Sequence, residues 1–316
     1  MGARTMFRSS GPNTLAAYAR ESYSLRRDVK ASTLRQYIIS AELFERWAGR
    51  PILLAELDED SLSEWLRDYA QVAKPHTVRG KKNMVLALWR AACDDGLADE
   101  PIARRVRRVR LPEIPVEAWT REEVERLLVA CSWLPRQHES GMSRAAWFDL
   151  AIRMAWDTGL RWGDLVNLPV SAIRPDGSGQ WTQSKTAKVI SFQVAASTME
   201  ILRASLEAFP RSLVCPWTAS HETWGDQVGL LVTKAGIRPG TWKWIRRGSG
   251  SDVEAQAPLS GHEHLGNTRR VFEQSYACRS IIGRTIPRPR ELLVGTLRRE
   301  DRKRGGGGAS QGNGLK

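Results

Sequence analysis

Hydrophobic residues in the first hundred positions recur at the three- and four-residue spacing of amphipathic helices. The pattern predicts a short helix near 13–20, longer helices over 31–48 and 77–95, and one more between these two that ends before Pro75. The apolar stripe of the second helix consists of Leu34, Tyr37, Ile38, Ala41, Phe44 and Trp47. Helices of this kind predict a small helical bundle over residues 10–103.

A strongly basic stretch that contains proline follows the predicted bundle. Its sequence, ARRVRRVRLPEIPVEAW, contains the closely spaced arginines Arg104, Arg105, Arg107, Arg108 and Arg110. Charged sequence interrupted by proline is typical of an extended connector between domains. We therefore expect residues 104–117 to form a basic linker.

The pattern changes in the second half of the chain. Thr120 and Glu123 form a capping-box signal at the start of one helix, and residues 143–158 predict another that ends at Gly159. Within 177–194 the segments QWTQS and KVISFQV, joined by KTA, predict a β-hairpin. Further helices are predicted over 197–208, 225–235, 242–255 and 268–278.

These patterns define a fold class and a domain order. We expect a mainly α protein with a small antiparallel β-sheet, in which a helical N-terminal bundle precedes an α+β domain over 118–290. The rest, 291–316, is predicted to be a C-terminal segment followed by a Gly-rich tail. The run GGGGASQGNG in that tail cannot bury apolar surface, so we expect it to be disordered.

Composition adds a partner class. The 316 residues carry a formal net charge of +13, from 48 Lys and Arg against 35 Asp and Glu. Such an excess of basic residues favours a polyanionic partner, because Lys and Arg displace the counterions condensed on phosphates. No stretch approaches the roughly 18 apolar residues of a membrane span, and the N-terminus lacks the apolar core of a signal peptide. We expect a soluble, cytoplasmic protein with no membrane partner.

The cysteines indicate neither a metal site nor disulfides. No CxxC spacing occurs among them, which argues against a zinc site and against a disulfide framework. We expect them to be buried thiols. They are Cys93, Cys131, Cys215 and Cys278.

Four segments of the second domain carry basic residues that, taken one at a time, are typical of solvated surface charge. In chain order they are DTGLRWGDLVNL, TQSKTAKVISF, KWIRRGSGSDVEA and HLGNTRRVFEQSYA. Together they resemble the tyrosine recombinase, or phage integrase, family. The family pattern has an Arg in a TGLR-type turn, a Lys in a β-hairpin, an HxxR box, an LGH box and a Tyr nine residues beyond the last His. Asn267 occupies that last His position, and 267 plus 9 gives 276, which is Tyr.

The resemblance implies a set of catalytic residues. Arg161 and Arg246 would hold the nonbridging oxygens of a DNA phosphate, since paired guanidiniums make forked, charge-assisted hydrogen bonds. Tyr276, the one tyrosine of the second domain, would be the nucleophile. Lys185, with Lys188 as the alternative, would protonate the leaving oxygen. The phosphotyrosine conserves the energy of the broken bond, so no nucleotide cofactor and no metal is expected.

Two positions depart from the family pattern. Lys243 stands where the HxxR box has His, and Asn267 stands where the LGH box has His. Lys243 can donate to phosphate but is a poor base at neutral pH unless burial lowers its pKa, and Asn267 cannot shuttle protons. His262 and His264 lie next to the LGH box, and we expect them to be loop histidines that face solvent, although either could compensate. These departures favour slow or conditional activity.

The leading hypothesis is therefore a site-specific recombinase or integrase that cuts and rejoins duplex DNA through a 3′-phosphotyrosine, with the connector arginines Arg104, Arg105, Arg107, Arg108 and Arg110 on phosphates. One alternative is a cleavage-impaired DNA-binding or regulatory protein, motivated by Lys243 and Asn267. Another is a type IB topoisomerase with the same chemistry. The resemblance also implies a homotetramer on paired DNA sites, linked by C-terminal segments passed between neighbours.

Overall fold

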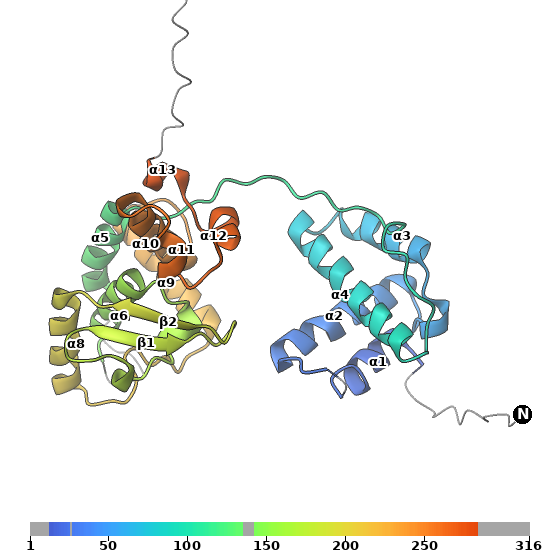
Figure 1. Cartoon of the computed structure of the whole chain (residues 1–316), viewed down its shortest axis with the longest axis horizontal. Helices are drawn as coiled ribbons and strands as arrows, with labels where there is room; N and C mark the ends of the chain where they lie inside the picture. Colours follow the sequence, from blue (N-terminus) through green and yellow to red (C-terminus); the bar gives the residue numbers. More distant parts are fainter. Residues whose placement is uncertain (1–12, 26, 135–141, 284–316) are drawn as a thin grey trace, which may run out of the picture. The chain divides into compact units, whose positions relative to one another are not determined.

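The computed structural model describes residues 13–25, 27–134 and 142–283, and the chain divides into two compact units between Ile114 and Pro115 (Figure 1). The division falls inside the stretch for which a linker is expected. The C-terminal segment and Gly-rich tail, expected over 291–316, lie outside the described residues.

The first unit is helical, as the sequence pattern predicted. Local backbone chemistry sets the ends of its longer helices. The Asp58 carboxylate caps the helix over 59–69, and Pro75 begins the helix over 75–94 at a position that needs no N–H. Gly49 ends the helix over 31–48 at φ 69°. The helices are α1 (Leu15–Glu21), α2 (Ala31–Ala48), α3 (Glu59–Tyr69) and α4 (Pro75–Asp94), with a 3₁₀ turn, η1, at Leu54–Glu56.

The chain after α4 remains attached to this unit instead of leaving it at once. Val106 is buried among the core residues of the first unit. The Lys82 ammonium donates to the carbonyls of Val106, at 3.0 Å, and Arg107, at 2.7 Å. The Arg107 N–H in turn donates to the Ser63 hydroxyl at 2.9 Å. The first part of the basic stretch is therefore tied to α3 and α4.

The second unit is mainly helical with one two-stranded antiparallel sheet (Figure 1). Strands β1 (Ser178–Thr182) and β2 (Val189–Gln193) pair in the register Trp181 to Ile190, which confirms the predicted hairpin. The helices are α5 (Arg121–Ala130), α6 (Arg144–Thr158), α7 (Trp162–Leu165), α8 (Ala196–Ala208), α9 (His221–Ala235), α10 (Lys243–Gln256), α11 (Gly261–His264), α12 (Arg269–Ser275) and α13 (Arg279–Ile282). Short 3₁₀ turns occur at η2 (Cys131–Trp133) and η3 (Val170–Ala172).

Local signals set several of these boundaries. The predicted capping box is present, because the Thr120 hydroxyl accepts from the Glu123 N–H and the Glu123 carboxylate accepts from the Thr120 N–H. Gly159 ends α6 in the left-handed region at φ 58°. A Cβ there would lie 2.6 Å from Leu265 Cδ2 and 2.8 Å from His264 Nε2. The absent side chain thus lets the end of α6 approach the end of α11.

The helix expected over 268–278 is shorter in the structure, and a separate short helix follows it. Helix α12 ends at Ser275, and α13 begins at Arg279. Tyr276 therefore lies at the end of a helix and not within one, with φ −130°. In Figure 1 helices α10, α11 and α12 cluster together, and α11 contacts β2. The hairpin and the segment that carries Tyr276 consequently meet around α11.

Two further findings concern the described part of the chain. None of its helices combines the length and apolar character needed to cross a membrane. Its cysteines are free thiols, and three of them, Cys131, Cys215 and Cys278, are buried as expected, while Cys93 is half-buried.

Candidate active site

Arg161 stands at the start of α7, in the turn that follows Gly159. Its guanidinium Nη1 donates to Gln183 Oε1 at 2.6 Å and lies 3.9 Å from Asp164 Oδ2. Asp164 is fully buried, and its other oxygen accepts from the Ser184 N–H at 2.8 Å. Asp164 thus holds the start of the hairpin turn through Ser184 and places a negative charge beside Arg161.

Lys185 lies in the turn between β1 and β2, with an exposed side chain. The turn is closed by the Gln183 carbonyl, which accepts from the N–H groups of Thr186, at 3.3 Å, and Ala187, at 2.9 Å. The charge of Lys185 contributes to lowering the pKa of Lys243, which means that the two ammonium groups are close enough to repel each other. An exposed lysine on a turn can move to meet a bound substrate.

Arg246 is buried inside the second unit, with 3% of its surface exposed. Its Nη1 donates to the Gly159 carbonyl, and its Nη2 donates to the Leu265 carbonyl at 2.6 Å. Burial lowers its pKa to about 10, yet it stays charged at neutral pH. The fork is therefore preorganised by two backbone oxygens and faces Tyr276, whose ring centroid lies 5.2 Å from the guanidinium carbon.

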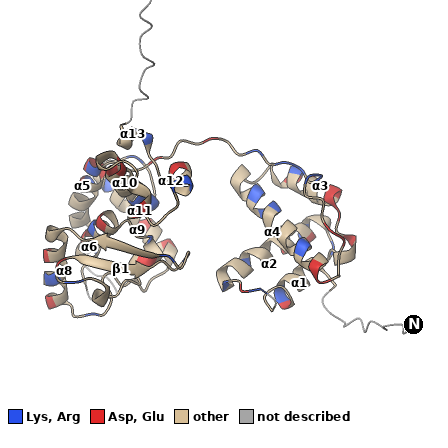
Figure 2. Cartoon of the chain, viewed as in Figure 1, with Lys and Arg blue, Asp and Glu red and all other residues tan. Residues whose placement is uncertain are grey.

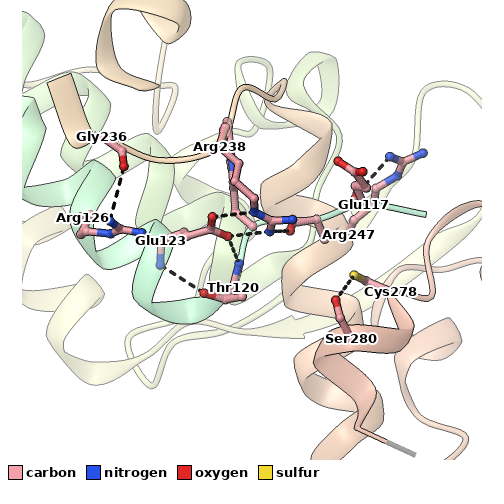
Figure 3. Close-up of polar contacts among 11 residues, drawn as sticks. Glu117, Thr120, Glu123, Arg126, Gly236, Arg238, Arg247, Cys278 and Ser280 are labelled. Carbon is pink, nitrogen blue, oxygen red and sulfur yellow. Dashed lines mark hydrogen bonds and ion pairs between the residues drawn. The ribbon is translucent and has the colours of Figure 1, made fainter. Parts of the chain in front are cut away.

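The neighbouring Arg247 points elsewhere. Its Nε donates to the Ser275 carbonyl at 3.0 Å. Its Nη1 donates to the Glu117 carbonyl, also at 3.0 Å (Figure 3). It thus fastens α10 to the end of α12 and to the chain that enters this unit. Of the two adjacent arginines, Arg246 is the one directed at the phenol.

Tyr276 is held by its backbone and surrounded by positive charge. Its N–H donates to the Phe272 carbonyl at 2.8 Å, and its carbonyl accepts from the buried Ser251 hydroxyl at 3.2 Å. The Lys243 ammonium lies 5.2 Å from the ring centroid. Burial alone would raise the pKa of the phenol, but the charges of Arg246, Lys243 and Arg161 lower it below its ordinary value. The phenol and three cationic side chains therefore meet in one place.

Lys243 occupies the first position of α10. Burial lowers its pKa, and the charge of Arg247 lowers it further, while Tyr276 acts in the opposite direction. A lysine can serve as a base near neutral pH only if its pKa is lowered, and the pKa of Lys243 is shifted in that direction.

Asn267 lies in the loop after α11, with 8% of its surface exposed. Its N–H donates to the His262 carbonyl at 2.9 Å, whereas its Nδ2 has no hydrogen-bond partner among the described residues. A buried amide donor without a partner is costly unless a ligand supplies an acceptor. Asn267 is therefore suited to donate to a phosphate oxygen.

His264 turns inward. Its Nε2 lies 2.6 Å from the Ser249 hydroxyl, and burial, with a contribution from the charge of Arg246, lowers its pKa to about 4. It is therefore neutral at physiological pH. The structure places its ring against Ser249 and the end of α6, which differs from the expectation of a loop histidine facing solvent.

A separate basic groove lies on the first unit. It is lined by α4 and by the connector, and its charged residues are Arg79, Lys82, Arg104, Arg108 and Arg110. Figure 2 shows Lys and Arg in blue along these two segments. Arg105 and Arg107 are exposed but do not line the groove. The structure thus brings together three of the five predicted connector arginines.

Sequence reasoning missed residues in both places. Arg79, Lys82 and Asn83 share the groove, and their i, i+3, i+4 spacing on α4 was a readable signal for one polar helix face. Gln183 contacts Arg161 across 22 positions, and no local pattern marks such a contact. Among the described residues, no group of three or more His, Cys, Asp or Glu is arranged to hold a metal.

Comparison with known proteins identifies the fold. No protein-family model and no curated protein matches this sequence. Solved structures do match: a lambda integrase dimer bound to a COC′ core site has a TM-score of 0.69 at 20% identity, covering 88% of this chain and 79% of that one. XerH site-specific recombinase bound to its difH substrate has a TM-score of 0.60 at 17% identity, with 79% and 77% covered.

The Tn1549 transposon integrase, in complex with circular intermediate DNA, is similar as well. Its TM-score is 0.59 at 13% identity, covering 84% of this chain and 95% of that one. These likenesses extend over both units. The chain therefore has the fold of these integrases and of this recombinase over most of its length.

Proposed function

We propose that this protein is a site-specific DNA recombinase of the tyrosine recombinase family, which cuts and rejoins duplex DNA through a covalent 3′-phosphotyrosine. The observation that carries the proposal is the position of Tyr276, with Lys243 and Arg246 each 5.2 Å from its ring centroid and its pKa lowered by surrounding charge. A tyrosine is a weak nucleophile at its ordinary pKa, and the surrounding positive charge favours the more nucleophilic phenolate.

The reaction follows from the roles that these residues can fill. The Tyr276 oxygen attacks the phosphorus, and the bond from phosphorus to the 5′ oxygen breaks. Arg161 and Arg246 stabilise the negative charge on the nonbridging oxygens. Lys185 moves with its turn and gives a proton to the departing 5′ oxygen. Rejoining reverses these steps, with a 5′ hydroxyl attacking the phosphotyrosine.

The two departures from the family pattern fit into the same scheme. Lys243 supplies a point charge and, with its lowered pKa, a route for the phenol proton. The free Nδ2 of Asn267 donates a hydrogen bond where the family has a histidine. Since an amide cannot shuttle protons, the acid-base support is weaker than in a site with two histidines. We expect slow turnover.

The first unit supplies affinity. Its groove of five charged residues is suited to phosphates, since each neutralised phosphate releases counterions. We propose that DNA lies along α4 and the connector, and that protomers assemble as a tetramer on paired sites. The lambda integrase tetramer on a Holliday junction is the comparable assembly among the matched structures.

The second candidate is a cleavage-impaired DNA-binding protein on the same fold. It is favoured by Lys243 and Asn267, and by the fact that both Nη atoms of Arg246 already bind backbone carbonyls. A topoisomerase would share the cleavage step but would not need two defined sites.

The test is a suicide substrate, a nicked duplex carrying the DNA that flanks the protein's own coding region. After incubation, a denaturing gel shows whether a covalent adduct forms. We expect an adduct with the wild type and none with Tyr276→Phe, whose noncovalent binding should be nearly intact because one hydroxyl is lost. Tyr69→Phe, the same change in the first unit, is the matched control and should react normally.

The outcomes separate the candidates. An adduct that persists in Tyr276→Phe would falsify the choice of nucleophile. Specific binding without any adduct in the wild type would favour the cleavage-impaired protein. Strand exchange that requires two sites, rather than relaxation of a supercoiled circle, would distinguish a recombinase from a topoisomerase.

A further inference from the structure

Gln183 is a fully buried amide directly after β1 that joins three parts of the candidate site. Its Oε1 accepts from Arg161 Nη1 at 2.6 Å and from the Thr186 hydroxyl at 2.9 Å. Its Nε2 donates to the Leu265 carbonyl at 3.1 Å. One side chain thus contacts the segment of Arg161, the turn of Lys185 and the loop that leads to Asn267.

The orientation of this amide is determined by its partners. A guanidinium has no acceptor, so the Gln183 oxygen must face Arg161, and a carbonyl has no donor, so the nitrogen must face Leu265. A carboxylate or an apolar side chain of the same length cannot satisfy both. Buried polar groups that lose a partner cost about 1–3 kcal/mol each.

The same carbonyl connects the two arginines. Leu265 O accepts from Gln183 Nε2 and also from Arg246 Nη2 at 2.6 Å. Arg161 and Arg246, which are 85 positions apart in the sequence (246 minus 161), are therefore linked through one amide and one backbone oxygen. The Gln183 carbonyl also closes the turn that carries Lys185.

We propose that Gln183 is a positioning residue, which fixes the separation of Arg161 and Arg246 and holds the Lys185 turn against them. The inference rests on the proposed function, in which these three residues act on one DNA phosphate. Gln183 itself does not touch the phosphate. It acts by setting where the two guanidiniums and the lysine converge.

Two substitutions remove this role in different ways. Gln183→Glu places a carboxylate next to Arg161, which reduces the positive charge of the site and turns an oxygen toward Leu265 O. Gln183→Met keeps the length of the side chain and removes the hydrogen bonds without adding charge. Gln193, at the far end of the same hairpin, donates through Nε2 to the carbonyls of Asp176, at 2.8 Å, and Val194, at 3.3 Å. The same two changes at Gln193 are the matched controls.

The first readout is the single-turnover rate of adduct formation on the nicked suicide substrate. A misplacement of reacting groups by about 1 Å can cost about 100-fold in rate, and we expect a loss of that order for both Gln183 variants. Binding to an uncleavable duplex should change far less, and the Gln193 variants should react within about twofold of the wild type. Wild-type rates in both Gln183→Glu and Gln183→Met would overturn the proposal.

The second readout does not depend on cleavage. The ionisation of the Tyr276 phenol is followed by ultraviolet absorbance, as the difference between each protein and the same protein with Tyr276→Phe. In Gln183→Met, Arg161 loses the acceptor that holds it and no charge is added, so the charge of Arg161 should act less on the phenol, which should then ionise at higher pH. Gln193→Met should leave the titration unchanged. An unshifted titration in Gln183→Met counts against the proposal.

The two readouts separate this inference from the proposed function. If the wild type forms no adduct, the proposed cleavage fails while the titration still decides the role of Gln183. If the wild type reacts and the Gln183 variants react equally well, the function stands and the positioning role is wrong. If Gln183→Glu does not fold, Gln183→Met decides by its rate relative to Gln193→Met.

Discussion

Replacing Arg246 by Met tests whether a buried arginine that bonds backbone oxygens serves chemistry or only the fold. Methionine keeps an unbranched stem of similar volume, so little packing is lost. The change removes the hydrogen bonds to the carbonyls of Gly159 and Leu265 and takes away the cation that faces Tyr276. The expected effect on stability and the effect on rate differ in size.

Two opposing contributions set the stability. The Gly159 carbonyl loses its donor, which costs about 1–3 kcal/mol, whereas the Leu265 carbonyl keeps the hydrogen bond from Gln183 Nε2. Burial lowers the pKa of Arg246 to about 10. This means that about 3 kcal/mol opposes keeping the group charged, and that penalty disappears in the variant. These two contributions are of similar size, so the free energy of unfolding should change by no more than about 2 kcal/mol.

The rate of DNA cleavage should be affected more strongly than the stability. Loss of one preorganised donor to a developing charge costs about 100- to 1000-fold, or about 2.7–4 kcal/mol in the barrier. Urea denaturation measures the first quantity, and single-turnover cleavage of the suicide substrate measures the second. Arg153→Met, which removes a partly exposed arginine paired with Asp149 on α6, is the control and should cleave normally.

Three results would refute this reasoning. A folded Arg246→Met protein that cleaves at the wild-type rate would remove Arg246 from the phosphate clamp. If Arg247→Met were inactive and Arg246→Met active, the assignment of these adjacent arginines would be wrong by one position. A loss of stability well above about 2 kcal/mol would show that the desolvation of the charge has been overestimated.

Three further predictions concern charge. Arg104→Ala with Arg108→Ala should weaken binding to any duplex and reduce the slope of log affinity against log salt by about 1.8, about 0.9 for each lost phosphate contact, as measured by fluorescence anisotropy; an unchanged slope would place the connector away from DNA. Because the pKa of His264 falls to about 4 from an ordinary 6.5, its unfolded form binds protons first, so the free energy of unfolding should decrease as pH drops from about 6.5 toward 4. Urea denaturation across this range should show a shallower dependence in His264→Gln, and equal slopes would contradict the burial of a neutral imidazole. Lys243→Met should raise the pKa of Tyr276 in an absorbance titration, because it removes one of the cations that stabilise phenolate; an unmoved titration would show that Lys243 does not act on the phenol.

The sequence by itself determined the local structure and the order of the candidate site residues along the chain. The stripe over 31–48 became α2 with these same bounds, the Thr120 capping box is present, and Gly159 ends α6. Each of these signals acts within a few residues, through a side-chain cap or a helical repeat, and so it can be read from one segment. The spacing from Asn267 to Tyr276 likewise belongs to a single stretch of chain.

Only the tertiary structure decided which of the candidate residues meet. Arg246 rather than Arg247 faces the phenol because the carbonyls of Gly159 and Leu265 receive its fork, and these contacts span 87 and 19 positions. The linker was expected to be extended, yet Lys82 ties its first part to the helical bundle and creates a groove that no single segment contains. Gln183 could not be singled out beforehand, since an amide between two distant segments leaves no periodic trace in the sequence. Such contacts form only when distant segments of the chain come together. They are selected by how the side chains pack in the folded unit, and a local sequence pattern does not show this packing.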